Sequence, residues 1–230
     1  MGTALSAHGP GCALVSVAGL VLNTLWQRYG SANSQRDVMG SPRFSWWVGV
    51  FHQTVVFPVL FAGAWRGTVG PETLGDWLRS GGLGAEPWLR WFHYVFFGYL
   101  VKDLAIPLST VLVAHHVVCL ALTTASLLGH PLECAPLFVT TVTFLEAGSA
   151  ILGYQSLFPK NRLLHRLCQV GMTLSNAASI SLAVWYVRCY PVAMNAHYLF
   201  PIVGGSLVLA RQQVEVARWS MWGKKPEKGA

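Results

Sequence analysis

The chain has 230 residues, of which 53% are hydrophobic and only 11% are Asp, Glu, Lys or Arg. A soluble domain carries roughly 25% charged residues, so this composition excludes an ordinary water-soluble protein and predicts an integral membrane protein. The formal charge of +7 does not indicate nucleic-acid binding, because the basic residues lie between apolar segments and form no stripe with interleaved aromatic residues.

Seven apolar stretches are long enough, or nearly so, to cross a bilayer, which takes about 20 helical residues. In chain order they cover about residues 11–26, 44–65, 88–106, 108–128, 135–157, 163–187 and 192–209. The first stretch is short, so a retained span competes there with a signal peptide, and we favour the retained span. We therefore expect an all-α, polytopic transmembrane helical bundle of about seven spans.

The connections between the spans carry their own signals. The longest one, 66–86, is rich in Gly and acidic residues, and we expect a surface loop with a short interfacial helix at 71–79. Pro107 joins the third and fourth spans as a tight helical hairpin, because proline suits the first turn of a helix. Pro201 lies inside the last span and predicts a kink.

The Lys and Arg residues are distributed unevenly between the two sides of the expected bundle. Four of the sixteen fall on one side, namely Arg66, Arg79, Arg90 and Arg188, and twelve fall on the other. Positive residues stay preferentially on the cytoplasmic or equivalent side, so this asymmetry predicts an outside N-terminus and an inside C-terminal tail.

The chain accordingly divides into three parts. An N-terminal span with its connecting loop covers 1–42, a membrane domain of six spans covers 43–211, and a basic tail covers 212–230.

Ionisable residues lie inside several spans, although each Asp, Lys or Arg costs about 2.5–3.5 kcal/mol at the bilayer centre. Counted along each helix, the polar residues of four spans fall within roughly one or two turns of a common level. The candidate ligand-binding residues are His52, His115, His116 and Glu146 in this layer, together with Asp103, which lies near the inner end of the third span and could close the layer from below. Gln169 and Asn176 lie near the same depth.

A carboxylate beside an imidazole can tune a histidine for proton transfer or orient it as a ligand. His115 and His116 are the candidate catalytic residues, but adjacent helical residues point about 100° apart, so we expect at most one of them to face a shared pocket. The alternative is structural: each polar residue can instead serve as an interhelical hydrogen-bonding group. Lys102 beside Asp103 is interpreted as a pair at the membrane boundary whose lysine reaches the interface.

Two further patterns have simple explanations. The small-residue runs 147–150 and 175–179 predict close helix packing. The cysteines lie far apart, without metal-binding spacing or a disulfide framework, so we interpret them as apolar fillers and expect no metal and no cofactor. They are Cys12, Cys119, Cys134, Cys168 and Cys189.

Several short motifs, on spans in the right order, resemble the TLC domain family, the membrane domain of ceramide synthases. The resemblance runs from about Arg43 to Arg211. It rests on Phe51-His52, the run 98–104 (Gly-Tyr-Leu-Val-Lys-Asp-Leu), His115-His116, the run 145–149 (Leu-Glu-Ala-Gly-Ser) and Asn161-Arg162. The resemblance implies a six-span domain that handles lipids, and with it an internal membrane such as the endoplasmic reticulum or another organelle.

One departure from that family bears on mechanism. Ceramide synthases follow the paired histidines with a further His-Asp and an Asp on the next span, whereas the corresponding stretch here, 138–144, carries neither. We therefore do not expect acyl transfer to a sphingoid base by that apparatus.

The leading functional hypothesis is a membrane protein that binds or senses a lipid in a cavity bounded by the candidate residues. The alternative is a non-catalytic subunit of a larger membrane complex, with other membrane protein subunits as partners. A lipid acyltransferase with His116 as general base comes third, a bis-histidine haem protein fourth, and a transporter last. Whether the chain is an enzyme stays open, with binding favoured over catalysis.

Overall fold

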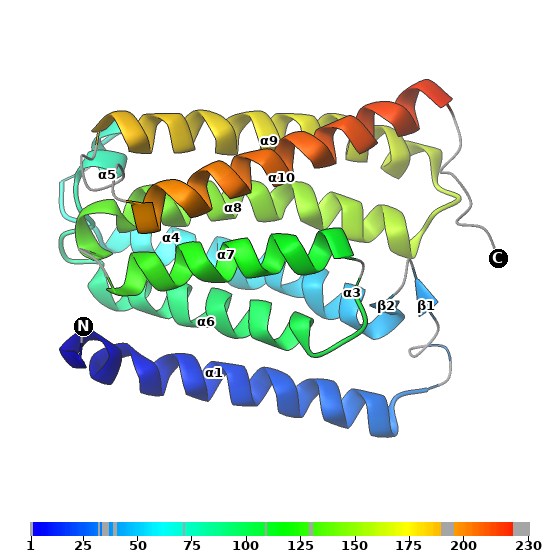
Figure 1. Cartoon of the computed structure of the whole chain (residues 1–230), viewed down its shortest axis with the longest axis horizontal. Helices are drawn as coiled ribbons and strands as arrows, with labels where there is room; N and C mark the ends of the chain where they lie inside the picture. The colour runs from blue at the N-terminus through cyan, green and yellow to red at the C-terminus, as the bar shows by residue number, and fades with distance from the viewer. Residues whose placement is uncertain are drawn as a thin grey trace.

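The chain folds into a bundle of long helices with one two-stranded hairpin (Figure 1). The computed structural model describes residues 2–31, 33, 37–38, 41–70, 72–108, 110–128, 131–189 and 196–222. The elements are α1 (Gly2–Tyr29), β1 (Asp37–Val38), β2 (Ser41–Pro42), α3 (Arg43–Phe51), the π-helical turn η1 (His52–Val56), α4 (Phe57–Gly67), α5 (Leu74–Arg79), α6 (Glu86–Leu104), α7 (Thr110–Leu128), α8 (Pro131–Leu157), α9 (Arg162–Cys189) and α10 (Ala196–Trp222). The expected all-α bundle is confirmed.

The long helices lie roughly along one direction and alternate in sense (Figure 1). We call one end of the bundle the basic end: there α1, α6 and α8 finish and α3, α7 and α9 begin. The short helix α5 lies at the opposite end.

A small antiparallel hairpin, which we did not predict, covers part of the basic end. Strands β1 and β2 pair through Val38 and Ser41. The Trp46 indole of α3 donates to the Val38 carbonyl at 2.8 Å, and the Ser41 hydroxyl donates to the Pro107 carbonyl at 2.8 Å. Pro107 thus lies in the connection between α6 and α7, and not in the first turn of α7, which begins at Thr110.

The segments α3, η1 and α4 form one nearly continuous helix with a wide turn in its middle. At that turn the Phe57 amide donates to the His52 carbonyl, five residues back. Pro58 follows immediately and has no backbone amide to donate. Such π-helical turns are rare and occur frequently at functional sites.

The predicted short helix in the 66–86 connection is present as α5. Thr73 and Asp76 form a reciprocal capping box at its start, and the hydrogen bond from Thr73 is the main reason that the pKa of the exposed Asp76 carboxyl is lowered. Trp77 is fully buried and donates from its indole to the Thr68 hydroxyl at 3.0 Å. This helix therefore anchors the loop in the core and does more than lie at an interface.

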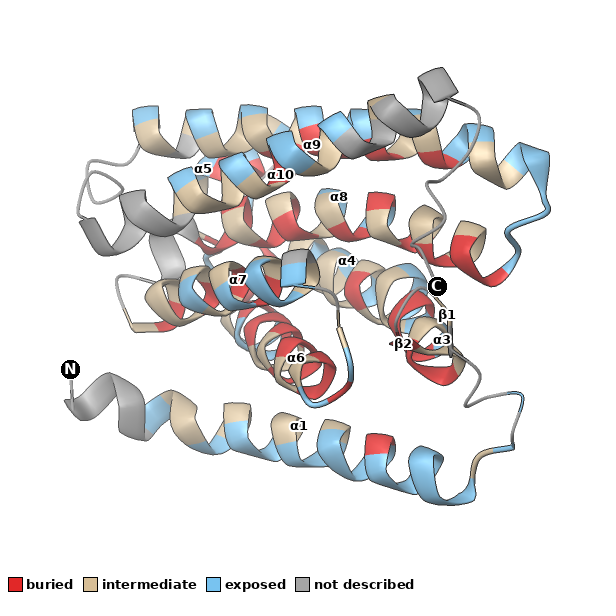
Figure 2. Ribbon diagram, turned by 45° about the vertical axis from the view of Figure 1, so that its right-hand side comes forward, coloured by how far each residue is buried: buried red, intermediate tan, exposed pale blue. Residues whose placement is uncertain are grey.

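The main core is aromatic, and Figure 2 shows buried turns on α3, α6 and α8, among other helices. Phe57 contacts Phe92, Phe96 and Tyr99, with ring centroids 5.5–5.7 Å apart. These aromatic contacts join α4 to α6.

Helices α8 and α9 approach each other closely, as the small-residue runs predict. A Cβ added at Gly148 would come within 2.5 Å of the Ser175 hydroxyl oxygen, so no larger residue fits without movement. The Ser175 hydroxyl donates to the Phe144 carbonyl at 2.8 Å.

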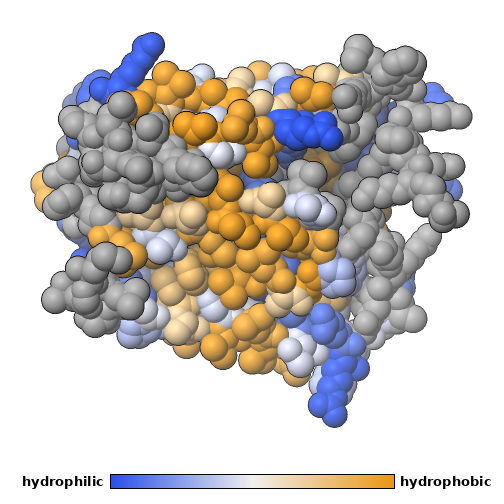
Figure 3. Space-filling view, in the orientation of Figure 1, coloured by the Kyte–Doolittle hydropathy of each residue, from blue (hydrophilic) through white to orange (hydrophobic). Residues whose placement is uncertain are grey.

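On the face of the bundle shown in Figure 3, apolar side chains form a broad band across the middle. Within the described residues, four helical segments are long and apolar enough to cross a membrane: Ala7–Tyr29, Arg43–Gly67, Ala135–Leu157 and Arg162–Trp185. The chain therefore has the features of a membrane protein. The count of four falls short of the seven stretches expected from the sequence.

The C-terminal helix is longer than the predicted span. We expected the span to end near residue 209 and a basic tail to begin at 212, but α10 continues to Trp222 and remains helical through Pro201. Residues 202–222 contain no proline and few helix breakers after Gly205, which explains the extension. The tail lysines at 224, 225 and 228 lie outside the described residues.

Candidate functional site

Polar side chains from four elements meet near the basic end of the bundle and line a cavity of about 130 Å³. Gln53 comes from η1, Asp103 from α6, His116 from α7 and Glu146 from α8. We call this the polar cavity. The structure thus brings together Asp103, His115, His116 and Glu146, four of the five candidate residues.

Three side chains, Lys102, Asp103 and His116, contact one another in turn, and the last two line the polar cavity. The Lys102 ammonium forms an ion pair with Asp103 Oδ1 and lies 4.9 Å from the centre of the Tyr99 ring. Asp103 Oδ2 faces His116 Nε2 at 3.4 Å. Lys102 is only 1% exposed. The interpretation of Lys102 as a residue reaching the membrane boundary is therefore wrong, because a carboxylate and an aromatic ring hold its amine inside the bundle.

Both ring nitrogens of His116 are occupied. Nδ1 lies 2.7 Å from the Leu112 carbonyl, which can only accept, so Nδ1 must carry a hydrogen. Nε2 faces the Asp103 carboxylate, and this contact is favourable when Nε2 also carries a hydrogen. In this arrangement His116 offers no free lone pair with which to take a proton from a substrate.

Gln53 and Tyr99 are site residues that the sequence reasoning missed. The Gln53 side-chain amide donates to Glu146 Oε2 at 2.8 Å and to the Tyr99 hydroxyl at 3.2 Å, so it links α6 and α8 to η1. Glu146 is 3% exposed, and the amide supplies a hydrogen bond that its buried carboxyl needs. The available signal was the position of Gln53 as a polar residue in an apolar span.

His52 lies beside the polar cavity and is not among the residues that line it. Its Nδ1 bonds to the Val48 carbonyl of its own helix at 2.8 Å. Its ring packs against Tyr99 with centroids 5.3 Å apart. The His52 side chain therefore packs against Tyr99 and does not line the polar cavity.

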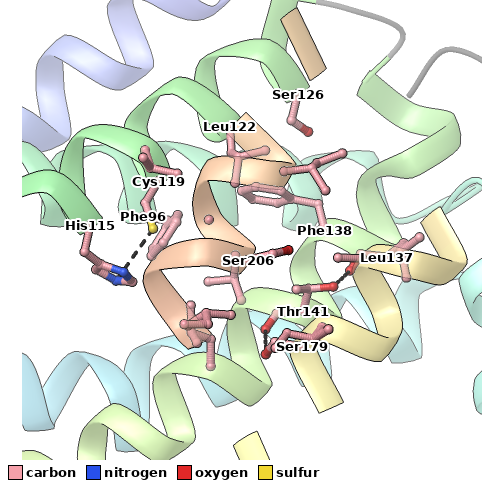
Figure 4. A pocket seen from close by; sticks show the side chains of 18 residues that line it. Phe96, His115, Cys119, Leu122, Ser126, Leu137, Phe138, Thr141, Ser179 and Ser206 are labelled. Atoms are coloured by element: carbon pink, nitrogen blue, oxygen red, sulfur yellow. Dashed lines mark hydrogen bonds between the residues drawn. The ribbon is translucent and has the colours of Figure 1, made fainter. Parts of the chain in front are cut away.

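A second cavity of about 130 Å³, which we call the apolar cavity, adjoins the first between α7, α8, α9 and α10. His115 lines both cavities, and the neighbouring pairs Leu145/Glu146 and Val208/Leu209 divide between them. Figure 4 shows His115 and Cys119 at one end of the apolar cavity and Ser126 at the other. These ends are eleven residues apart on α7, which corresponds to ~16 Å of helix.

The paired histidines both line the polar cavity, although we expected at most one to face it. Their rings lie at 83° to each other with centroids 5.6 Å apart. His115 reaches the boundary between the two cavities, where its Nε2 lies 3.6 Å from Cys119 Sγ. Because the two cavities lie on different sides of α7, His116 can line the polar cavity while the adjacent His115 lies at the boundary between the two.

The remaining polar residues of the predicted layer lie elsewhere. Gln169 contacts His165 of its own helix at 3.1 Å. Asn176 donates to Gln213 of α10 at 3.2 Å, and Gln213 donates to Thr173 at 2.7 Å. The bonds of Gln213 to Asn176 and Thr173 join α9 to α10, and α10 forms one wall of both cavities.

Within the described residues, no group of three or more His, Cys, Asp or Glu side chains is placed to hold a metal ion. The polar cavity offers hydrogen-bond donors and acceptors from amide, hydroxyl, imidazole and carboxyl groups.

Comparison of this chain with protein-family models, with curated proteins and with solved structures finds no match. The resemblance to the TLC domain family therefore stays a prediction from motifs and their order.

Proposed function

We propose that this chain is a seven-span, TLC-like membrane protein that binds a membrane lipid inside its bundle, in an internal membrane such as the endoplasmic reticulum. The observation that carries the proposal is the junction of a polar and an apolar cavity at His115. An amphiphile needs this combination, with its head group among the polar residues and its chain among the apolar ones.

The proposed count of seven adds α6, α7 and α10 to the four apolar spans. Helices α6 and α7 each have 19 residues, or ~28 Å, close to the hydrocarbon thickness of a bilayer. Polar residues lower the mean hydropathy of α6, but His93, Lys102 and Asp103 are all buried inside the bundle. A helix whose polar side chains face the protein can still present an apolar surface to lipid.

The size of the cavities limits how much of a lipid they hold. An apolar cavity of about 150 Å³ accepts a benzene ring. Two cavities of about 130 Å³ therefore hold a compact lipid head group and the first part of one lipid hydrocarbon chain. Both cavities are partly open, so the rest of the lipid hydrocarbon chain can extend out of them.

The polar cavity decides selectivity in this proposal. A lipid chain that leaves the bilayer for an apolar cavity gains little, because it was already out of water. The head group, in contrast, must replace its lost water contacts with hydrogen bonds to residues such as Gln53 and Glu146. The engaged nitrogens of His116 favour binding over acyl transfer with His116 as general base.

The proposal is tested by purifying the protein, extracting the lipids that remain bound and identifying them by mass spectrometry. We expect one lipid class to be enriched over the host membrane. Ala183→Phe, which fills the apolar cavity, should remove the enrichment. Ala177→Phe on the exposed side of the same helix should keep it.

The proposal fails if no lipid class is enriched, or if Ala183→Phe and Ala177→Phe retain the same lipid in equal amounts. Stoichiometric co-purification of another membrane protein with no enriched lipid would instead favour the subunit hypothesis.

A further inference from the structure

We infer that α1 belongs to the polar site: Asn23 and Gly19 are positioning residues that hold the last turn of α6, with Lys102 and Asp103, in place. The sequence placed α1 in a separate N-terminal part, outside the domain that carries the candidate residues. The contacts between α1 and α6 connect it to the site regardless of which ligand the cavities bind.

Asn23 caps the C-terminal end of α6 from a different helix. The last carbonyls of a helix lack their usual partners four residues on, and α6 ends in a tighter turn, in which the Ala105 amide bonds to the Lys102 carbonyl at 3.3 Å. The Asn23 side-chain amide donates to that same carbonyl at 2.8 Å. The shorter bond therefore comes from α1.

Gly19 brings the backbone of α1 against the side chain of Lys102. A Cβ added at Gly19 would lie 3.0 Å from Lys102 Cβ, tighter than ordinary packing allows. A lysine near the end of a span usually extends to the membrane surface. Here α1 covers its aliphatic stem, and its amine turns instead to Asp103 and Tyr99.

The exposure pattern along α1 singles out Asn23. Figure 2 shows α1 at the edge of the bundle with most of its surface exposed. Among its described side chains, 7–29, Asn23 alone is buried, at 3% exposure. Its Oδ1 has no hydrogen-bond partner in the described part of the chain. An apolar residue at position 23 would leave no buried oxygen unpaired. The hydrogen bond that Asn23 donates to the Lys102 carbonyl therefore explains why an amide side chain stands there.

The positioning then passes from α1 to the cavity in two steps. Asn23 fixes the backbone at Lys102, and the next residue, Asp103, contacts His116 Nε2. Loss of the cap should let the last turn of α6 move and leave His116 Nε2 without its carboxylate.

The test measures how fast diethyl pyrocarbonate modifies individual histidines in the full-length purified protein, read by mass spectrometry. His93 is an internal reference, since it lies on α6, is 2% exposed and has both nitrogens engaged by Leu89 and Ser126. In Asn23→Leu we expect His116 to react roughly fivefold faster, the factor for losing one hydrogen bond. His93 should keep its rate.

Matched variants separate positioning from general loosening. Gly19→Leu should act like Asn23→Leu, whereas Gly9→Leu should not, because a Cβ at Gly9 meets nothing within 4 Å. Thr24→Leu should also be silent, since the Thr24 hydroxyl bonds within α1 to Leu20. Asn23→Gln keeps the amide donor and should restore the protection of His116.

The inference is overturned if His116 keeps its wild-type rate in Asn23→Leu, or if His93 and His116 accelerate together, which would mean that α1 only stabilises the bundle. It is also overturned if Asn23→Gln behaves like Asn23→Leu. None of these rates requires a bound lipid, so failure of the lipid-binding proposal would be visible separately as an absence of enriched lipid.

Discussion

The buried pair of Lys102 and Asp103 gives the sharpest prediction for stability. Both side chains are almost inaccessible, at 1% and 8% residue exposure. Asp103→Asn keeps the shape of the side chain and removes the charge that balances Lys102. Removing one partner of a buried ion pair costs about 3–5 kcal/mol, because the other charge stays buried and unpaired. We therefore expect the free energy of unfolding to fall by about 3 kcal/mol, or more than a hundredfold in the equilibrium constant.

The double variant shows whether pairing is the cause. Lys102→Met alone should also destabilise, because it leaves Asp103 with only the longer contact to His116. In Lys102→Met/Asp103→Asn neither buried charge remains. We expect its destabilisation to be at least about 2 kcal/mol smaller than the sum of the two single effects.

The assay is reversible unfolding of the purified protein in mixed micelles with a rising fraction of sodium dodecyl sulfate. Arg79→Met is the matched control, since it breaks the exposed ion pair with Asp76 and should cause no measurable change. A loss below about 1 kcal/mol for Asp103→Asn, or strict additivity in the double variant, would refute the reasoning about a buried charge.

Three other substitutions test particular contacts. Gln53→Leu should remove the bound lipid, because the variant loses the hydrogen bonds that Gln53 donates to Glu146 and Tyr99. His52→Phe keeps a ring beside Tyr99 and should retain the lipid. Bound lipid is measured by mass spectrometry, and the reverse result would place His52 in the site. Trp77→Phe should lower the free energy of unfolding by about 2 kcal/mol through the lost indole bond to Thr68, and an unchanged unfolding curve would show that α5 does not anchor the loop.

The polar layer illustrates how far sequence reasoning reached. Counting residues along each helix placed His116 and Glu146 near a common depth and Asp103 below them, near the inner end of its span, and the structure brings all three to one cavity. Depth follows from the constant rise of a helix, so it can be read without knowing the fold. Helix rotation does not follow in this way, because it depends on which neighbours each face packs against.

Helix rotation explains why Gln53, and not the predicted His52, lines the polar cavity. Both residues lie at nearly the same depth, and the sequence favoured the histidine because its chemistry is richer. The π-helical turn beginning at His52 changes the angle between successive side chains, and it directs Gln53 to Glu146 and His52 to Tyr99. A local change in hydrogen-bond register has no clear signature in composition or hydropathy.

Composition and hydropathy alone were enough to determine a helical membrane protein with buried polar groups, because each helix in lipid must satisfy its own backbone and present an apolar surface. Only the tertiary structure decided that the polar cavity adjoins an apolar one at His115, and that Asn23 of α1 bonds to the Lys102 carbonyl in the last turn of α6. These are contacts between residues far apart in the chain. They depend on the relative rotation and closeness of packed helices, which periodicity within one helix does not specify.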